Sequence, residues 1–295
     1  MIAATSGAAP VKRVCKLLGA SRATLYRHRA PPAESRPRGP EPSVSDDELA
    51  SRIRARLDDR ERYFGFRGEG HRKVHAWLRF SGVRVARRRV LRVMRENGLL
   101  APTRTGRRRG PYVHDGNLIT ELPDQMWGTD ATMGFTRRDG WAWVFIAVDH
   151  CTGELVGVHA AKPGTRFEAL EPIHQGVREH FGALGEGVAA GLVVRHDHGS
   201  QYISDHFQGE LRFLGAESSP SFVGAPEGNG VAERFMRTLK EQLLWVQDFE
   251  TVEDLRRELL DFRDRYNEYW MLGRHGYVCP AEARRRLSGP TLMVA

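Results

Sequence analysis

A change of hydrophobic periodicity near Gln125 is the feature that most restricts the fold of this chain. Strand-like segments follow that point, and pairs of turn residues separate them: residues 125–135, 140–150 and 153–161. Connections as short as Asp139-Gly140 and Thr152-Gly153 join strands that run in opposite directions. The three segments therefore predict an antiparallel meander.

Helices and strands alternate after the meander. In order, the pattern predicts a helix over 166–181, a strand over 191–197, a helix over 204–214, a short strand near 216–219 and two long helices. Such alternation indicates a mixed sheet with helices on both faces. The layout matches an α/β fold class, a ribonuclease-H-like mixed five-stranded sheet with flanking helices.

The part of the chain before this core is predicted to be all-α and is strongly basic. Its first 112 residues contain 27 Lys and Arg against 10 Asp and Glu, whereas the remainder contains 18 against 27. A basic arm joined to a domain with an acidic site is typical of proteins that bind a polyanion. The charge distribution therefore predicts nucleic acid as the partner.

Residues 1–30 have the pattern of a helix-turn-helix segment, with Ser21 as a candidate N-cap of its second helix. Such helices contact DNA through their first turns. The candidate DNA-binding residues here are Ser21, Arg22, Thr24, Tyr26 and Arg27. The alternative is a small helical hairpin whose basic residues are merely solvated.

A second basic helical module follows a Pro-rich linker, residues 31–45. Its last helix places Val85, Val90, Val93 and Met94 inward. Arg95 stays outside together with the candidate DNA contacts Arg87, Arg88 and Arg92. A solvated arginine face is the alternative. The further expected boundaries are 46–104 for this DNA-binding domain, 105–122 for a basic linker, 123–288 for the catalytic core with C-terminal helices, and 289–295 for a tail.

Acidic residues in three separate stretches of the core are predicted to converge. Asp130 lies in the first strand, Asp197 ends the strand 191–197, and Glu233 lies on a helix, with 35 residues between the last two. At 100° per residue, Arg237 and Lys240 share the face of Glu233, opposite Val231, Phe235, Leu239 and Val246. Hard carboxylate oxygens select Mg²⁺ or Mn²⁺, and two such ions suit phosphodiester chemistry.

Other polar and aromatic residues have simpler expected roles. His196 and His198 should point away from Asp197, and Asp149 should serve the turn after its strand. Trp127, Trp141 and Trp143 are expected in the core, and Tyr266, Tyr269 and Trp270 are expected to pack on the sheet. The scattered cysteines and the lack of a long apolar run predict a soluble, cytoplasmic protein with no membrane segment.

Motifs over nearly the whole chain resemble the OrfB transposases of the insertion-sequence-three family, which share the retroviral integrase core. The motifs WGTD, HDHGSQY, GNGVAERFMRTLK and YNEYWMLGRHGYVCPAEA occur in the expected order and spacing. The resemblance implies metal-dependent DNA strand cleavage and strand transfer at the ends of a mobile element, without a covalent protein intermediate. It implies Asp130, Asp197 and Glu233 as catalytic metal ligands, with two Mg²⁺ ions or Mn²⁺ as a substitute.

The same resemblance implies how the enzyme meets its partners. Lys240 takes the place of a basic residue that contacts the element's end, and Asn229 lies in a glycine-rich segment resembling a mobile active-site loop. The expected partners are double-stranded DNA, both terminal inverted repeats and target, a second copy of the chain on DNA, and an upstream-frame partner or fusion. Two alternatives stay open: a DNA-binding regulator that does not cleave, and a nuclease that only hydrolyses DNA or an RNA–DNA hybrid.

Overall fold

A computed structural model describes residues 10–19, 21–23, 26, 43–58, 68–101, 120–221 and 229–288. The chain divides into two compact units, Met1–Ser45 and Asp46–Ala295. In the first unit α1 spans Val11–Leu17. Most of both linkers, the residues 224–228 and the tail 289–295 lie outside the described residues, so the predicted domain boundaries stay predictions.

Three helices in the second unit form the basic helical module: α3 (Asp46–Asp58), α4 (His71–Phe80) and α5 (Arg87–Glu96). Their apolar residues at helical spacing are fully buried, among them Ile53 on α3, Leu78 on α4 and Val93 on α5. The predicted inward set is confirmed for Val90, Val93 and Met94, which are all 0% exposed, whereas Val85 precedes α5 and is partly exposed. The arginines between them remain outside.

The described part of the core contains a five-stranded sheet in the order β3-β2-β1-β4-β5. Its strands are β1 (Met126–Thr136), β2 (Gly140–Asp149), β3 (Leu155–Ala161), β4 (Val193–His196) and β5 (Glu217–Pro220). The β1–β2 and β2–β3 pairs are antiparallel, whereas β4 is parallel to both β1 and β5. The predicted meander and mixed sheet are confirmed, and the fold is ribonuclease-H-like.

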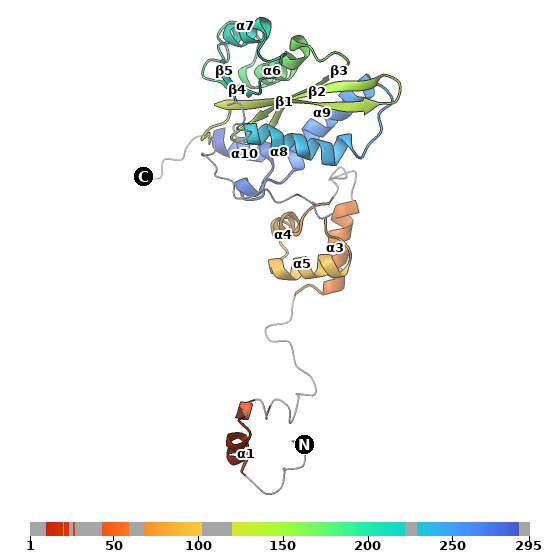
Figure 1. Ribbon diagram of the computed structural model, residues 1–295, viewed down its shortest axis with the longest axis vertical. Helices are drawn as coiled ribbons and strands as arrows, with labels where there is room; N and C mark the ends of the chain where they lie inside the picture. Colours follow the sequence, from red (N-terminus) through yellow and green to blue (C-terminus); the bar gives the residue numbers. More distant parts are fainter. Residues whose placement is uncertain are drawn as a thin grey trace, which may run out of the picture. The chain divides into compact units, whose positions relative to one another are not determined.

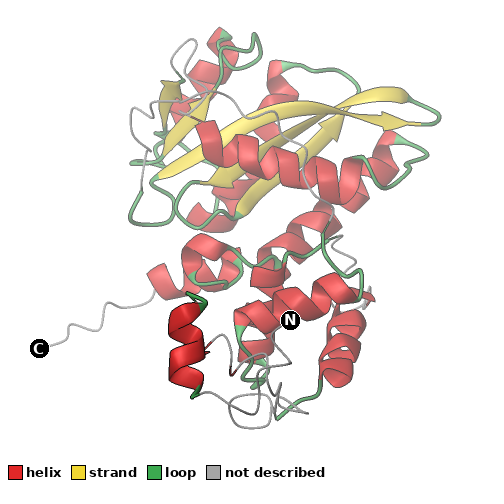
Figure 2. Ribbon diagram, turned by 60° about the horizontal axis from the view of Figure 1, so that its bottom comes forward, coloured by secondary structure: helices red, strands yellow, loops and turns green. Residues whose placement is uncertain are grey.

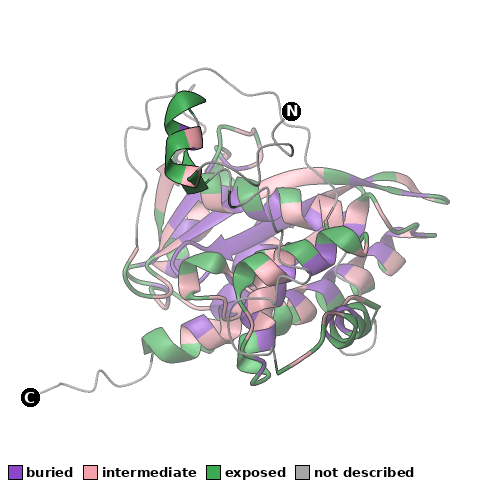
Figure 3. Ribbon diagram, turned by 90° about the horizontal axis from the view of Figure 1, so that it is seen from below, coloured by how far each residue is buried: buried purple, intermediate pink, exposed green. Residues whose placement is uncertain are grey.

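Helices cover both faces of this sheet (Figure 1). On one face lie α6 (Arg166–Phe181) and α7 (Asp205–Leu214); on the other lie α8 (Gly230–Leu239), α9 (Val252–Tyr269) and α10 (Pro280–Ser288). The strands form a single twisted layer between the two sets of helices (Figure 2). Side-chain burial is accordingly concentrated along the strands and the inward faces of these helices (Figure 3).

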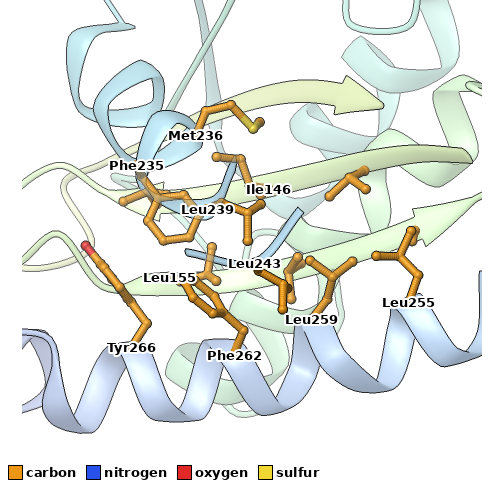
Figure 4. Packing of buried hydrophobic residues seen from close by; sticks show 14 of the residues in the cluster. Ile146, Leu155, Phe235, Met236, Leu239, Leu243, Leu255, Leu259, Phe262 and Tyr266 are labelled. Atoms are coloured by element: carbon orange, nitrogen blue, oxygen red, sulfur yellow. The ribbon is translucent and has the colours of Figure 1, made fainter. Parts of the chain in front are cut away.

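Strand β2 shows how one segment supplies two hydrophobic cores. Val144 and Ile146 belong to the cluster beneath α8 and α9, whereas Phe145 and Ala147 belong to the cluster beneath α6 and α7. Alternate residues of a strand point to opposite faces, so a nearly continuous apolar run is required when both faces are covered. Phe235, Leu239 and Phe262 complete the first cluster (Figure 4).

Candidate active site

Asp130 lies in the middle of β1, on the face covered by α8 and α9. Gly128 and Gly134 share this face with it, because a Cβ at Gly128 would meet Ala232 of α8 and one at Gly134 would meet Leu255 of α9. The Asp130 side chain is partly buried, and its Oδ1 accepts a hydrogen bond from the Ala131 N–H at 2.8 Å. The sheet therefore fixes the direction of this carboxylate.

Asp197 follows β4 directly, and the sheet register brings it beside Asp130. The parallel pairing matches Met126 with Val193 and Gly128 with Arg195. The paired residues end at Gly128 and Arg195. Two further steps in the same register would place Asp197 opposite Asp130, with neighbouring strands about 4.8 Å apart. The exposed Asp197 accepts a hydrogen bond through Oδ1 from the Gly199 N–H at 2.8 Å.

Glu233 lies in the first turn of α8 and is exposed. The backbone of this turn comes close to β1, since Ala232 Cβ would be 3.2 Å from a Cβ at Gly128. The first turn of a helix favours a negative side chain, because the backbone N–H groups there are unpaired. The structure thus brings the strand of Asp130, the end of β4 and the first turn of α8 into one neighbourhood.

The charges of this neighbourhood act on Asp130. The pKa of Asp130 is raised to about 6, chiefly by burial and also by the negative charges of Asp197 and Glu233, whereas the Ala131 N–H and Lys240 act in the opposite direction. The effect of both other carboxylates on Asp130 follows from their proximity to it. A divalent cation would relieve the repulsion among them.

The donor set fits a hard divalent ion, although the side chains are not yet closed around one. Within the described ranges, no three His, Cys, Asp or Glu side chains are gathered closely enough to hold a metal. Three carboxylates are nevertheless the oxygen ligands that Mg²⁺ and Mn²⁺ prefer. Because Asp197 and Glu233 are exposed, their side chains have room to change rotamer and close on an ion.

Arg237 and Lys240 lie beyond Glu233, as the helical spacing predicts, but the helix changes its pitch there. A π-helical turn spans Lys240–Leu244. Lys240 remains close enough to lower the pKa of Asp130, and the exposed Arg237 pairs with Glu241 at 2.9 Å. The expected inward position of Val246 is wrong, because the wider turn ends the 100° spacing and leaves that residue partly exposed.

Asn229 is not at the surface, contrary to its expected contact with DNA. Its side chain is 5% exposed and its Nδ2 donates to the Thr129 carbonyl at 2.8 Å. The side chain therefore faces the sheet rather than a ligand. A glycine-rich sequence context suggested an exposed loop, whereas Asn229 is the N-cap residue of α8.

The two histidines beside Asp197 contact atoms other than its carboxylate, and His196 Nδ1 lies 2.6 Å from the Asp197 backbone carbonyl oxygen. His196 Nε2 lies 2.9 Å from Ser218 Oγ and its ring packs on Tyr202. His198 Nε2 lies 2.6 Å from the Ser221 carbonyl oxygen. The turn role of Asp149 is confirmed, because its Oδ1 accepts from the N–H and the hydroxyl of Thr152.

The aromatic residues divide differently from the expectation. Trp127 is fully buried and Tyr266 is 4% exposed, so both belong to the core as predicted. Trp141 is 59% exposed and Tyr269 is 40% exposed, so those two predictions are wrong. Trp141 lies beside the β1–β2 turn with Phe135 as its ring neighbour, and alternation sets the face of a residue without telling whether that face is covered.

The candidate DNA contacts of the helical modules are mostly exposed where they are described. Ser21, Arg22 and Tyr26 are exposed, and Thr24 and Arg27 lie outside the described residues. On α5, Arg87 and Arg88 are exposed and line the same surface hollow. Arg92 is different, because it pairs with Asp46 at 2.6 Å and with Glu96 at 2.9 Å.

Asp130→Asn is expected to stabilise the metal-free protein by about 2 kcal/mol at pH 8 and to have little effect near pH 4. Because its pKa rises from 3.8 to about 6 on folding, the folded state binds more protons than the unfolded state in this interval. The contribution of the wild-type Asp130 carboxyl to the free energy of unfolding is therefore complete below pH 3.8 and lost as the pH rises through 6. Denaturant unfolding in EDTA at both pH values measures this, and an equal shift at both would contradict it.

Two segments of the chain match known protein families. A family model described as an integrase core domain matches residues 214–269, and one described as an HTH-like domain matches residues 45–108. The latter falls on the second basic module. Glu233 and Lys240 lie in the first matched segment, and Arg87 and Arg88 lie in the second.

Two curated relatives and one solved structure have similar sequences or folds. The chain is 28% identical over 249 residues to the transposase for insertion sequence element IS629 of Shigella sonnei, covering 81% of this chain and 80% of that protein. It is 29% identical over 201 residues to the transposase for IS904 of Lactococcus lactis, covering 64% and 76%. The catalytic core domain of BIV integrase matches at 21% identity with a TM-score of 0.40, covering 55% and 95%.

Proposed function

We propose that this chain, an insertion-sequence-three family transposase with an integrase-type core, holds two Mg²⁺ ions through Asp130, Asp197 and Glu233. The enzyme is a DNA-binding polynucleotidyl transferase that depends on divalent metal. We assign the catalytic role to these three residues, with Mn²⁺ as a substitute for Mg²⁺. The observation that carries the assignment is that β1 with Asp130, the end of β4 before Asp197 and the first turn of α8 with Glu233 lie in one neighbourhood.

The fold explains why these three residues suit the task. Asp130 is held by the sheet and is central, so it suits the position shared between two ions. Asp197 and Glu233 approach it from the end of β4 and from the first turn of α8. When bound, the ions supply an activated oxygen nucleophile, charge neutralisation and a stabilised leaving oxygen. No protein side chain has to form a covalent bond to DNA.

Lys240 and Arg237 supply positive charge next to these acids. Lys240 acts electrostatically on Asp130, which supports a place beside the reacting phosphate. Arg237 lies exposed on the same helix, one turn after Glu233. We propose that both contact the phosphate backbone, where cations fix the position of the DNA without reading its sequence.

The helical modules are proposed to hold the element ends. Exposed arginines on α5, Arg87 and Arg88, suit phosphate contacts, and Arg92 would have to leave Asp46 and Glu96 to join them. Ser21, Arg22, Thr24, Tyr26 and Arg27 are proposed DNA contacts of the first module, 1–30. The remaining domain boundaries are proposed as predicted from the sequence.

The substrate implied by this chemistry is double-stranded DNA, with the terminal inverted repeats of an element and a target. An element has two ends to be held, so we propose a homo-oligomer assembled on DNA. An upstream-frame partner or fusion is part of the same proposal. The protein would then work in the bacterial cytoplasm, at the nucleoid. Among the helices that the structure describes, none combines the length and apolar character needed to span a bilayer.

A strand-transfer assay tests the proposed function. The full chain is incubated with Mg²⁺, a labelled duplex that ends in the element's terminal repeat, and a target duplex. We expect strand cleavage that exposes a 3′-hydroxyl, followed by joined products, and no products in EDTA. Hydrolysis without joining would favour the nuclease, and binding without cleavage at any Mg²⁺ or Mn²⁺ concentration would favour the DNA-binding regulator.

A further inference from the structure

Gly128 leaves a small space on β1, and polar atoms from two other segments point into it. A Cβ at Gly128 would lie 2.7 Å from Asn229 Oδ1 and 2.7 Å from His150 Nε2. Asn229 and His150 are each 5% exposed, and neither of these two atoms has a hydrogen-bond partner among the described residues. Buried polar atoms without partners are uncommon, so a structural or functional reason must keep them there.

The amide nitrogen of Asn229 links β1, which carries Asp130, to α8, which carries Glu233. Its Nδ2 donates to the Thr129 carbonyl at 2.8 Å. Thr129 immediately precedes Asp130 on β1, and Asn229 is the N-cap residue of the helix that carries Glu233. One buried hydrogen bond therefore ties the first turn of α8 to the strand backbone next to Asp130.

The third acid-bearing segment is tied to the same residue of β1. The Thr129 hydroxyl donates to the Tyr202 hydroxyl at 3.4 Å, and both side chains are buried. The Tyr202 N–H donates to the Gly199 carbonyl at 2.9 Å, and the Gly199 N–H donates to Asp197 Oδ1. Thr129 thus links the segments of Asp130, Asp197 and Glu233 through its two polar groups.

The absence of a side chain at Gly128 is what makes the Asn229 contact possible. A methyl carbon there would lie 2.7 Å from the amide oxygen and 3.2 Å from Ala232 Cβ in the first turn of α8, so the amide would have to move. His150 closes the space from the end of β2. Burial, with Arg274 and Arg195 nearby, lowers the pKa of His150 to about 4, so its ring is uncharged at neutral pH.

We propose that Asn229 is a positioning residue that fixes the Glu233 helix against the Asp130 strand, so that the carboxylates can close on divalent ions together. The inference rests on the proposed function of these acids. A displacement of about 1 Å in a catalytic group can cost 10²-fold in rate. Loss of the hydrogen bond from Asn229 to the Thr129 carbonyl should therefore reduce both the rate of strand cleavage and the affinity for the ions, while the DNA-binding surfaces are unaffected.

Asn229→Ala and Asn229→Asp in the full chain test this role. We expect the alanine variant to lower kcat for strand cleavage about 10- to 100-fold and to raise the Mg²⁺ concentration for half-maximal rate, with Kd for DNA within about twofold. Aspartate has nearly the same shape but lacks the N–H donor, so its rate should fall at least as far. A wild-type metal requirement in both variants would overturn the proposal.

Asn267→Ala is the matched control. Asn267 forms the same kind of amide bridge between a helix and a strand, because its Nδ2 donates to the Leu155 carbonyl at 3.0 Å and its Oδ1 accepts from the Leu155 N–H at 2.9 Å. It joins α9 to β3, and neither element carries a proposed metal ligand. We expect Asn267→Ala to lower Tm and to leave the Mg²⁺ requirement unchanged. Asn229→Ala would give that same result if the role of Asn229 were merely structural.

Gly128→Ala supplies an independent test through coupling. The new methyl group would displace the Asn229 amide, so the single variant should show the same defect in metal requirement. The double variant Gly128→Ala/Asn229→Ala should be no worse than Gly128→Ala alone, since both changes break one contact. Additive losses would overturn the inference.

Failure of the wild type to cleave would instead refute the proposed function, and a fully active Asn229→Ala would refute the positioning role alone.

Discussion

Glu233→Gln is expected to lower divalent-ion-dependent strand cleavage by about 10³-fold or more, while Kd for DNA stays within about twofold. Glutamine keeps the size of the side chain and removes the negative charge that an ion requires. Glu233 is exposed in the first turn of α8, so the substitution should not disturb the core. Cleavage rates and DNA affinity measured on one preparation check both parts of the prediction.

Glu241→Gln is the matched control for this prediction. Glu241 lies eight residues further along, in the π-helical turn, and pairs with Arg237 at 2.9 Å. Exposed pairs at this spacing contribute about 0.3–0.5 kcal/mol, so stability should hardly change. The cleavage rate should remain within about threefold of wild type. Equal losses in both variants, or an active Glu233→Gln, would contradict the assignment of Glu233 as a metal ligand.

The elements of the core could be predicted closely because they follow from local periodicity. The helix predicted over 166–181 spans Arg166–Phe181, and the strand predicted over 140–150 spans Gly140–Asp149. In α6 burial recurs at the helical period, whereas β2 is a nearly continuous apolar run bounded by turn residues, so neighbouring residues are sufficient to define each element. The mixed, doubly covered sheet followed from the order of these elements.

The site required information that local sequence does not contain. Motifs identified Asp130, Asp197 and Glu233, but the adjacency of the first two depends on the parallel register of β1 and β4. That register joins segments far apart in the chain. The π-helical turn at Lys240–Leu244 also departs from the 100° spacing that the preceding helix predicts, and Leu243 within it belongs to the core cluster.

Asn229 illustrates the same limit from the opposite direction. Its position beside glycines suggested an exposed loop that meets DNA, but its role is set by Gly128, about a hundred residues earlier in the chain. A glycine in a strand signals a close approach of some other group without identifying it. The partner becomes visible once the fold has brought β1 and α8 together.

The second large effect expected is on stability: Gly157→Ala should destabilise the core by about 3 kcal/mol or more. A Cβ at Gly157 of β3 would lie 2.0 Å from the Pro172 carbonyl oxygen and 2.6 Å from the Pro172 Cα, both backbone atoms of α6. The backbone atoms of a helix cannot relieve such a clash by changing rotamer, as a flexible side chain can. The helix would have to move off the sheet and expose part of the cluster around Trp127 and Ile173.

Gly209→Ala on α7 isolates this cause from the general effect of replacing glycine. The nearest atom to its Cβ would be Arg212 Nη2 at 3.8 Å, so there is room, and alanine in a helix is about 0.5–1 kcal/mol more favourable than glycine. The two substitutions add the same methyl group and should change the free energy of unfolding in opposite directions. If Gly157→Ala unfolds like the wild type in denaturant, the close approach of α6 to β3 is wrong, and with it the packing that holds the sheet of Asp130 in place.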